Sequence, residues 1–130
     1  MARKGQELQG PGVKVTILEL DPELLTMEVS YDGDARMPPQ HYHPSQAEHF
    51  TVLQGQMHTV IDGAERVYGE GESFDVPVAA RHQMGPHGGP ARVRWEVRPA
   101  QRTAEFFEIL YTGKADENFL TEFSDEIRFD

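Results

Sequence analysis

The residue types with the clearest chemistry lie in one short stretch, where two histidines are followed by a carboxylate. His41 and His43 are two positions apart, and Glu48 follows five positions after His43. On an extended strand, alternate side chains share one face, so both imidazoles can point at the same spot. Pro44 and Ser45 interrupt the strand, and the turn can bring Glu48 back to the imidazoles. Two imidazoles and an anionic oxygen are good ligands for a divalent transition metal, so we expect a metal site with a fourth ligand from elsewhere.

The composition predicts a globular domain and excludes several kinds of site. A chain of 130 residues fits one domain, and 38% hydrophobic and 26% charged residues are ordinary values. Because the chain has no cysteine, it can form neither a disulfide nor a thiolate zinc site. The net charge of −10 argues against nucleic acid and anionic membranes as partners. We find no secretory signal and no run long enough to cross a membrane, so we expect a cytoplasmic protein.

Short strands separated by turns make up most of the chain. We expect an entry loop at residues 7–11 and strands at 13–20, 24–31, 48–54, 57–61, 65–68, 73–77, 81–84 and 91–97. Asp62-Gly63 is the strongest hairpin signal among the turns. Short strands with a turn about every 8–12 residues are typical of an antiparallel sandwich or barrel.

After residue 100 the pattern becomes that of helices. Apolar residues at i and i+4 form the pairs Phe106/Leu110 and Phe107/Tyr111. Residues 116–127 could form a second helix. Neither helix would be stable alone, so we expect residues 101–130 to form a helical tail that packs on the barrel of residues 1–100 or on a dimer partner.

A second pattern supplies a candidate for the missing ligand. His82 follows Gly71 and Pro77 at the start of a short predicted strand. With this histidine, the chain resembles the cupin superfamily, in its small single-domain bacterial form. The first cupin motif, Gly-x5-His-x-His-x3–4-Glu-x6-Gly, is matched at His41, His43, Glu48 and Gly55, and the second, Gly-x5-Pro-x-Gly-x2-His-x3-Asn, at Gly71, Pro77 and His82.

Three motif positions differ from the cupin pattern. Ala35 and Ala79 stand where the motifs have glycine, and Pro86 stands where the second motif has asparagine. None of the three is a ligand, so the metal site itself is intact. Glycine adopts a positive φ easily and alanine does so poorly, so the two alanines put the conformation of their loops in question.

The resemblance, which covers roughly residues 12–98, implies an all-β fold, a double-stranded β-helix (cupin or jelly-roll) barrel that pairs into a homodimer. The predicted tail adds a short C-terminal helical appendage to this barrel. It also implies one divalent metal bound by His41, His43, Glu48 and His82, with open coordination positions for a substrate or dioxygen. Iron, manganese, nickel, copper and zinc all fit this ligand set.

Strand parity predicts which other residues surround the metal. The candidates whose side chains point inward are Phe50, Met57, Thr59 and Trp95. The polar candidates at the mouth of the barrel are Gln40, Arg36 and Gln83. His87 lies in a glycine-rich loop near the mouth and is the candidate catalytic residue, for proton transfer.

Three functions are compatible with these residues. The favoured one is a metal-dependent enzyme that acts on a small organic molecule, with dioxygenase-type oxidation as its reaction. The second is a metal-dependent isomerase, epimerase or lyase on a sugar or keto acid, which would need an acid–base pair. The third is a non-catalytic cupin that binds a small ligand. No lysine lies in the central strands, which argues against Schiff-base chemistry.

Overall fold

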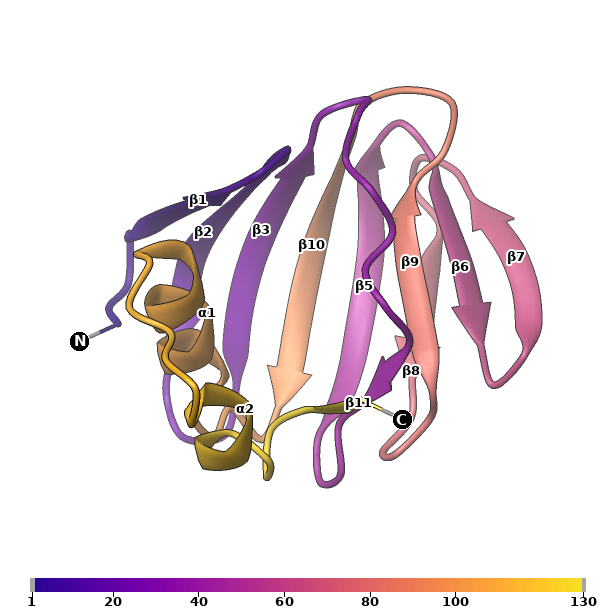
Figure 1. Ribbon diagram of the computed structural model, residues 1–130. Coiled ribbons are helices and arrows are strands. Elements are labelled where there is room, and N and C mark those ends of the chain that lie inside the picture. Colours follow the sequence, from indigo (N-terminus) through magenta and orange to yellow (C-terminus); the bar gives the residue numbers. More distant parts are fainter. Residues whose placement is uncertain (1, 130) are drawn as a thin grey trace.

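Two antiparallel sheets make up most of the computed structural model, which describes residues 2–129 (Figure 1). The strands of the first sheet are β1 (Glu7–Gly10), β2 (Val13–Leu20), β3 (Leu25–Tyr31), β5 (Ala47–Gln54), β8 (Ser73–Val76) and β10 (Ala91–Arg98). The strands of the second sheet are β4 (His41–Tyr42), β6 (Met57–Ile61), β7 (Ala64–Tyr68), β9 (His82–Pro86) and β11 (Arg128–Phe129). The first sheet has the order β1-β2-β3-β10-β5-β8 and the second the order β11-β4-β9-β6-β7.

The predicted all-β barrel is confirmed, and each predicted strand is present with its ends shifted by at most two residues. The hairpin turn between β6 and β7 has a positive φ at both Asp62 (48°) and Gly63 (81°), as a two-residue turn of this kind requires. The entry loop expected at 7–11 is wrong, because residues 7–10 form β1, which pairs with β2. Its glycines and proline make the tip of a hairpin, which composition alone does not separate from a loop.

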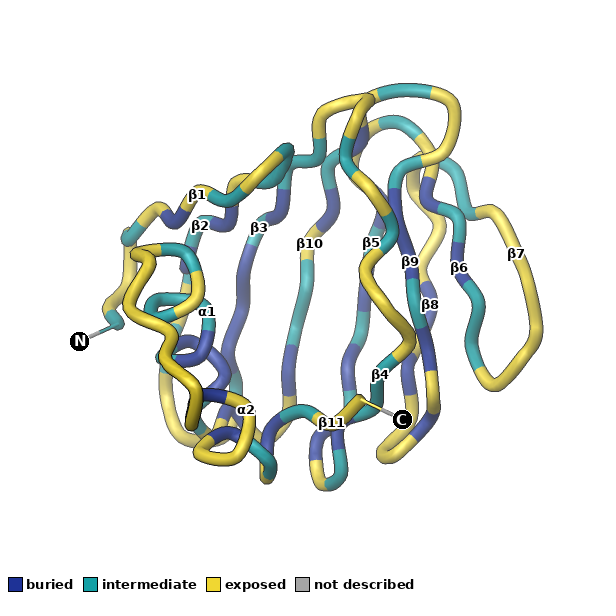
Figure 2. The backbone as a smooth tube through the Cα atoms, viewed as in Figure 1, coloured by how far each residue is buried: buried dark blue, intermediate teal, exposed yellow. Residues whose placement is uncertain are grey.

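The hydrophobic core lies between the two sheets, where alternate side chains of their strands meet. Figure 2 shows buried and more exposed positions alternating along several strands. Ile17 of β2, Met27 of β3 and Val93 of β10 are fully buried. Because successive side chains of a strand point to opposite faces, these residues share the inner face of the first sheet.

Two helices follow the barrel strands, and the first of them lies beside β1 (Figure 1). Helix α1 (Thr103–Tyr111) is followed by the single-turn helix α2 (Phe119–Glu122). The longer second helix expected at 116–127 is wrong: the chain leaves α2 in turns and ends in β11. One turn is enough to pack Phe119 and Phe123 against Phe106, and the extended backbone of β11 is needed to pair with β4.

Among the residues that the structure describes, no helix has both the length and the apolar character needed to span a membrane. The division of the chain at residue 100 stays a prediction.

Candidate metal centre and its cavity

Three histidine side chains meet on the second sheet, where β4 pairs with β9. His41 of β4 and His82 of β9 are register partners, and their ring centroids lie 4.3 Å apart. The ring of His43 lies 5.1 Å from each of the other two. Each histidine offers one ring nitrogen, and the three nitrogens lie within 4.8 Å of one another. This spacing could hold one metal ion.

The outer ring nitrogen of each histidine faces a backbone carbonyl. The Nδ1 atoms lie 3.0 Å from the oxygen of Pro39 for His41, 2.7 Å from that of Glu126 for His43, and 2.9 Å from that of Ala80 for His82. A carbonyl oxygen only accepts, so each Nδ1 carries the hydrogen and donates it. In a neutral imidazole this leaves the Nε2 lone pair free, which is the form that binds a metal.

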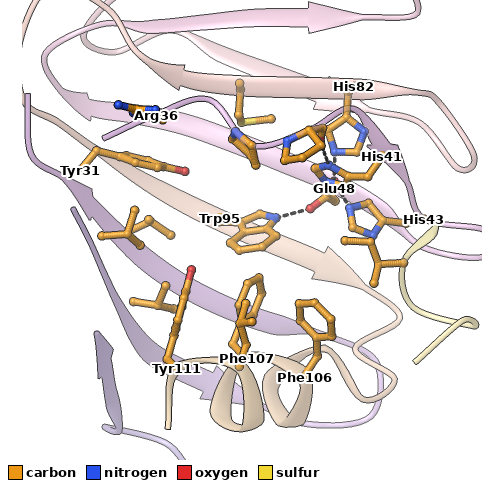
Figure 3. A pocket seen from close by; sticks show the side chains of 18 of the residues that line it. Tyr31, Arg36, His41, His43, Glu48, His82, Trp95, Phe106, Phe107 and Tyr111 are labelled. Atoms are coloured by element: carbon orange, nitrogen blue, oxygen red, sulfur yellow. Dashed lines mark hydrogen bonds and ion pairs between the residues drawn. The ribbon is translucent and has the colours of Figure 1, made fainter. Parts of the chain in front are cut away.

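Glu48 brings a carboxylate from the first sheet to the same point. Its Oε1 atom lies 3.1 Å from Nε2 of His43 and 3.2 Å from Nε2 of His82. Its Oε2 atom accepts a 2.7 Å hydrogen bond from the indole N–H of Trp95 (Figure 3). With the hydrogen of His43 on Nδ1, its Nε2 and Oε1 of Glu48 are both acceptors and do not satisfy each other. Within residues 2–129, neither of these buried atoms has a hydrogen-bond partner. A bound cation would satisfy both acceptors, so the donor set fits a metal ion.

The charges around these side chains set their protonation. Burial opposes the ionisation of Glu48, but His43 and His82 outweigh it and lower the pKa of its carboxyl to about 2. Burial, reinforced by the neighbouring His82, lowers the pKa of His41 to about 4. Burial acts on His43 in the same direction, but the Glu48 carboxylate raises its pKa above the usual value. Near neutral pH the cluster therefore contains an anionic carboxylate and a neutral His41.

A cavity of about 310 Å³ opens beside the histidines (Figure 3). Its walls are mostly apolar, and Phe50 and Trp95 contribute their rings from the barrel side. These two rings are stacked, with centroids 5.5 Å apart and planes 14° apart. The cavity lies at the lower end of the size range of roughly 300–1,000 Å³ that is usual for small-molecule sites.

The C-terminal tail forms one wall of the cavity. Its cavity-lining residues come from α1 and from the segment that leads into β11, and they are Phe106, Phe107, Leu110, Tyr111, Ile127 and Phe129. The tail also touches the histidines directly. The carbonyl of Glu126 accepts from His43, β11 pairs with β4, and the ring of Phe129 lies 5.9 Å from that of His41.

The predicted pocket residues separate into three groups. Phe50, Trp95 and Arg36 line the cavity. Met57 and Thr59 are buried on the inner face of β6 but belong to the core, outside the cavity lining. The remaining polar candidates also lie outside the lining: Gln40 is exposed, and Gln83 donates a long 3.4 Å hydrogen bond to the carbonyl of Pro38.

His87 lies in the loop after β9 and is exposed. Its ring centroid is 6.0 Å from that of His58, whose Nε2 contacts a carboxylate oxygen of Glu65 at 2.5 Å. The structure does not bring His87 into the cavity lining. Its role in proton transfer stays a prediction.

Sequence reasoning missed Tyr31 and the tail residues among those that line the cavity. The signal for Tyr31 was present, since it shares a strand face with Leu25, Met27 and Val29. For the tail, the i, i+4 pairs indicated an apolar helix face but not what that face covers.

The loop before His82 keeps the shape that the motif glycine would allow. Ala79 has a φ of 64°, in the left-handed region that alanine rarely adopts. Its N–H donates a 2.9 Å hydrogen bond to the carbonyl of His43, and the next residue, Ala80, accepts from His82. The strained residue therefore joins the loops that carry two of the three histidines.

Comparisons with known proteins agree with the fold. The family model described as the cupin domain matches residues 27–97. KdgF from a Halomonas species superposes with a TM-score of 0.68 at 22% identity, covering 74% of this chain and 87% of its own. An RmlC-like cupin from Shewanella frigidimarina superposes with a TM-score of 0.68 at 24% identity, and the match covers 75% of this chain and 86% of that protein. A variant of Pac13 from Streptomyces with uridine has a TM-score of 0.62 at 16% identity, and the match covers 76% of this chain and 79% of that protein. Pac13 is described as a nucleoside dehydratase. No curated protein matches the chain.

Proposed function

This chain is a member of the cupin family, and we propose that it is a metal-dependent enzyme acting on a small, flat, largely apolar molecule. The favoured reaction is dioxygenase-type oxidation. One observation carries the proposal: three imidazole nitrogens and a buried carboxylate converge at one end of a cavity whose other walls are mostly apolar.

His41, His43 and His82 would hold the metal, with Glu48 as the fourth ligand. Three neutral imidazoles and one carboxylate leave a divalent ion with a net positive charge and with coordination positions to spare. Such an ion supplies Lewis-acid polarisation and, if it is redox-active, electron transfer to dioxygen.

The surrounding residues prepare the site in three ways. The backbone carbonyls fix the imidazole tautomers, so each Nε2 is directed inward without reorganisation. The indole N–H of Trp95 fixes one oxygen of Glu48 and leaves the other for the ion. Phe50, Phe107 and the other aromatic walls exclude water from the substrate space, which strengthens the electrostatic interactions inside it.

The lining favours oxidation of an apolar ring over chemistry on a sugar. Apart from the proposed ligands, the hydrogen-bonding side chains among the described lining residues belong to Tyr31, Arg36, Trp95 and Tyr111. The indole of Trp95 is already engaged with Glu48. A sugar carries a hydroxyl on most of its carbons, and most of these would lose hydrogen bonds to water here without replacement.

The second candidate is an isomerase or lyase, and Tyr111 and Tyr31 favour it as possible proton donors. The likeness to a nucleoside dehydratase points the same way. In this reading His87 is the further acid–base candidate. Replacing His87 with asparagine tests that role: we expect an activity within about twofold of wild type, since the ring lies outside the cavity lining. A large loss would establish the role.

Metal content and dioxygen consumption separate the candidates. The full chain would be purified without added metal and analysed by mass spectrometry, then loaded anaerobically with iron(II), manganese(II), nickel(II), copper(II) or zinc(II). Small aromatic acids and phenols would be compared with sugars as substrates in a dioxygen electrode. A redox-active metal with substrate-dependent consumption supports oxidation. Zinc or nickel with turnover but no consumption supports the second candidate, and no binding of any metal leaves a ligand-binding module.

Two further expectations stay predictions. One is a homodimer, which sedimentation velocity would detect. The other is a cytoplasmic location, which fractionation of cells would measure.

A further inference from the structure

The cavity has a second polar group of side chains at the end away from the histidines. Tyr31 ends β3, Tyr111 ends α1, and Arg36 lies in the loop between β3 and β4. In Figure 3 the hydroxyls of Tyr31 and Tyr111 both point into the space between the sheet and α1. Tyr31 and Arg36 are five positions apart and Tyr111 lies in the C-terminal tail, and none of the three is a fixed position of a cupin motif.

These polar groups have no hydrogen-bond or ion-pair partner among the residues that the structure describes. No other residue of the described range 2–129 makes a hydrogen bond with either tyrosine hydroxyl or an ion pair with Arg36. Arg36 is also the one lysine or arginine among the described lining residues. Hydroxyls that face an apolar cavity are normally satisfied, so a ligand atom is the natural partner. Burial raises the pKa of Tyr31 and that of Tyr111, so both hydroxyls stay protonated and able to donate.

The walls between the two ends suit a flat ring. The ring of Trp95 stacks on Phe50 and meets Phe107 edge-on, with centroids 5.5 Å and 5.4 Å away. Aromatic side chains pack favourably against the faces and edges of another aromatic ring. A cavity of about 310 Å³ has room for a molecule of one or two rings.

We propose that Tyr31, Tyr111 and Arg36 form a subsite for an anionic oxygen group, of which a carboxylate is the simplest. The substrate is then an aromatic molecule with two polar ends, one facing the histidines and the other held by this subsite. The proposal rests on the proposed function for the role of the histidine end, but the subsite is defined by its own three residues. Two donated O–H bonds and one positive charge match the acceptor-only chemistry of a carboxylate.

Fluorescence of Trp95 provides the test, because it is the only tryptophan in the chain and it lines the cavity. The zinc-loaded protein would be titrated with 4-hydroxybenzoate and with 4-hydroxybenzamide, which has nearly the same shape but no charge. We expect the wild type to bind the benzoate at least about tenfold more tightly, the usual value of a hydrogen bond to a charged group.

Variants assign that preference to the subsite. Arg36→Gln should remove most of it, and Tyr31→Phe and Tyr111→Phe should each lower benzoate affinity about tenfold with little change for the benzamide. The matched controls are Arg94→Gln, an exposed arginine on β10, and Tyr68→Phe, a tyrosine outside the lining. Both controls should keep the wild-type preference.

The same titrations after chelation of the metal separate this proposal from the proposed function. Preference for the benzoate in metal-free protein, lost in Arg36→Gln, supports the subsite even if no metal-dependent activity is found. Equal affinity for the two probes, binding of neither, or a preference unchanged by all three substitutions overturns the subsite, even if the metal and its activity are present.

Discussion

The two ends of the cavity are built in opposite ways. At the histidine end, each imidazole is fixed by a hydrogen bond to a backbone carbonyl, and Glu48 is fixed by Trp95. At the tyrosine end, Tyr31 and Tyr111 contribute hydroxyls that have no hydrogen-bond partner within residues 2–129. At the histidine end, the side chains are already held in position before any substrate binds, and only a cation is needed to complete the site. The tyrosine end is incomplete until a ligand supplies acceptors. The comparison suggests that the histidine end serves reactivity and the tyrosine end serves selection.

The largest effect should follow from breaking the histidine end at one ligand. His41→Ala removes one of three imidazoles from the proposed site, and we expect loss of stoichiometric metal at micromolar concentration, measured by mass spectrometry after dialysis. The control is His49→Ala, because His49 is paired with Asp75 away from the cavity. Full metal occupancy in His41→Ala would remove His41 from the ligand set.

A smaller effect should come from the tail, which supports the histidine end from outside. A chain ending at Ser124 lacks the Glu126 carbonyl that accepts from His43 and lacks β11, which pairs with β4. Losing such a supporting partner should weaken metal binding about 10–100-fold, measured by competition with a chelator. Leu120→Ala changes an exposed tail residue and serves as the control. Unchanged affinity in a folded truncated chain would make the histidine end independent of the tail.

Trp95 lies between the two ends, and its N–H can be removed while its bulk is largely kept. Trp95→Phe leaves Oε2 of the buried Glu48 carboxylate without its donor. We expect the free energy of unfolding of the metal-free protein to fall by about 2 kcal/mol. Chemical denaturation followed by circular dichroism measures it, with Tyr68→Phe as the control. No loss of stability would mean that water replaces the indole at Glu48, and that the histidine end is less preorganised than described.

The smallest expected effect is a gain in stability at the histidine end. Ala79→Gly relieves a φ of 64°, which costs alanine about 1–2 kcal/mol. The greater freedom of glycine in the unfolded chain offsets about 0.4–1 kcal/mol of this. We therefore expect the free energy of unfolding to rise by about 0.5–1 kcal/mol. Ala64→Gly, at an exposed β7 position without positive φ, should not stabilise. Destabilisation by Ala79→Gly would show that the loop holds this conformation without strain.

Sequence reasoning was most informative for the histidine end, since its geometry is local. His41 and His43 share a face because side chains alternate along extended chain, although only His41 belongs to β4. Turns between strands account for the spacing that brings Glu48 and His82 to the same point. Parity was less informative for Met57 and Thr59. Parity places both side chains on the inner face of the sheet, but it does not determine their position along the barrel axis. In the structure both lie in the core.

The tyrosine end could not be predicted from local sequence patterns, because it depends on how the helical tail packs against the barrel. Tyr111 reaches the cavity because α1 packs beside β1, where its ring lies so close to Gly10 that a β-carbon there would be 2.4 Å from a ring atom. The periodicity of α1 indicated an apolar face, but many surfaces could have covered it. The second helix was overestimated for a related reason, since the pairing of β11 with β4 outweighs the helical preference of residues 123–127.

The hydrogen bond between His43 and Glu126 joins residues that are 83 positions apart. Contacts of such separation are costly in chain entropy and form only after the segments between them have been ordered. A nascent chain would therefore have both cupin motifs outside the ribosome well before His43 acquires its partner. The order of synthesis thus delays the finished metal centre until the barrel behind it can already be folded.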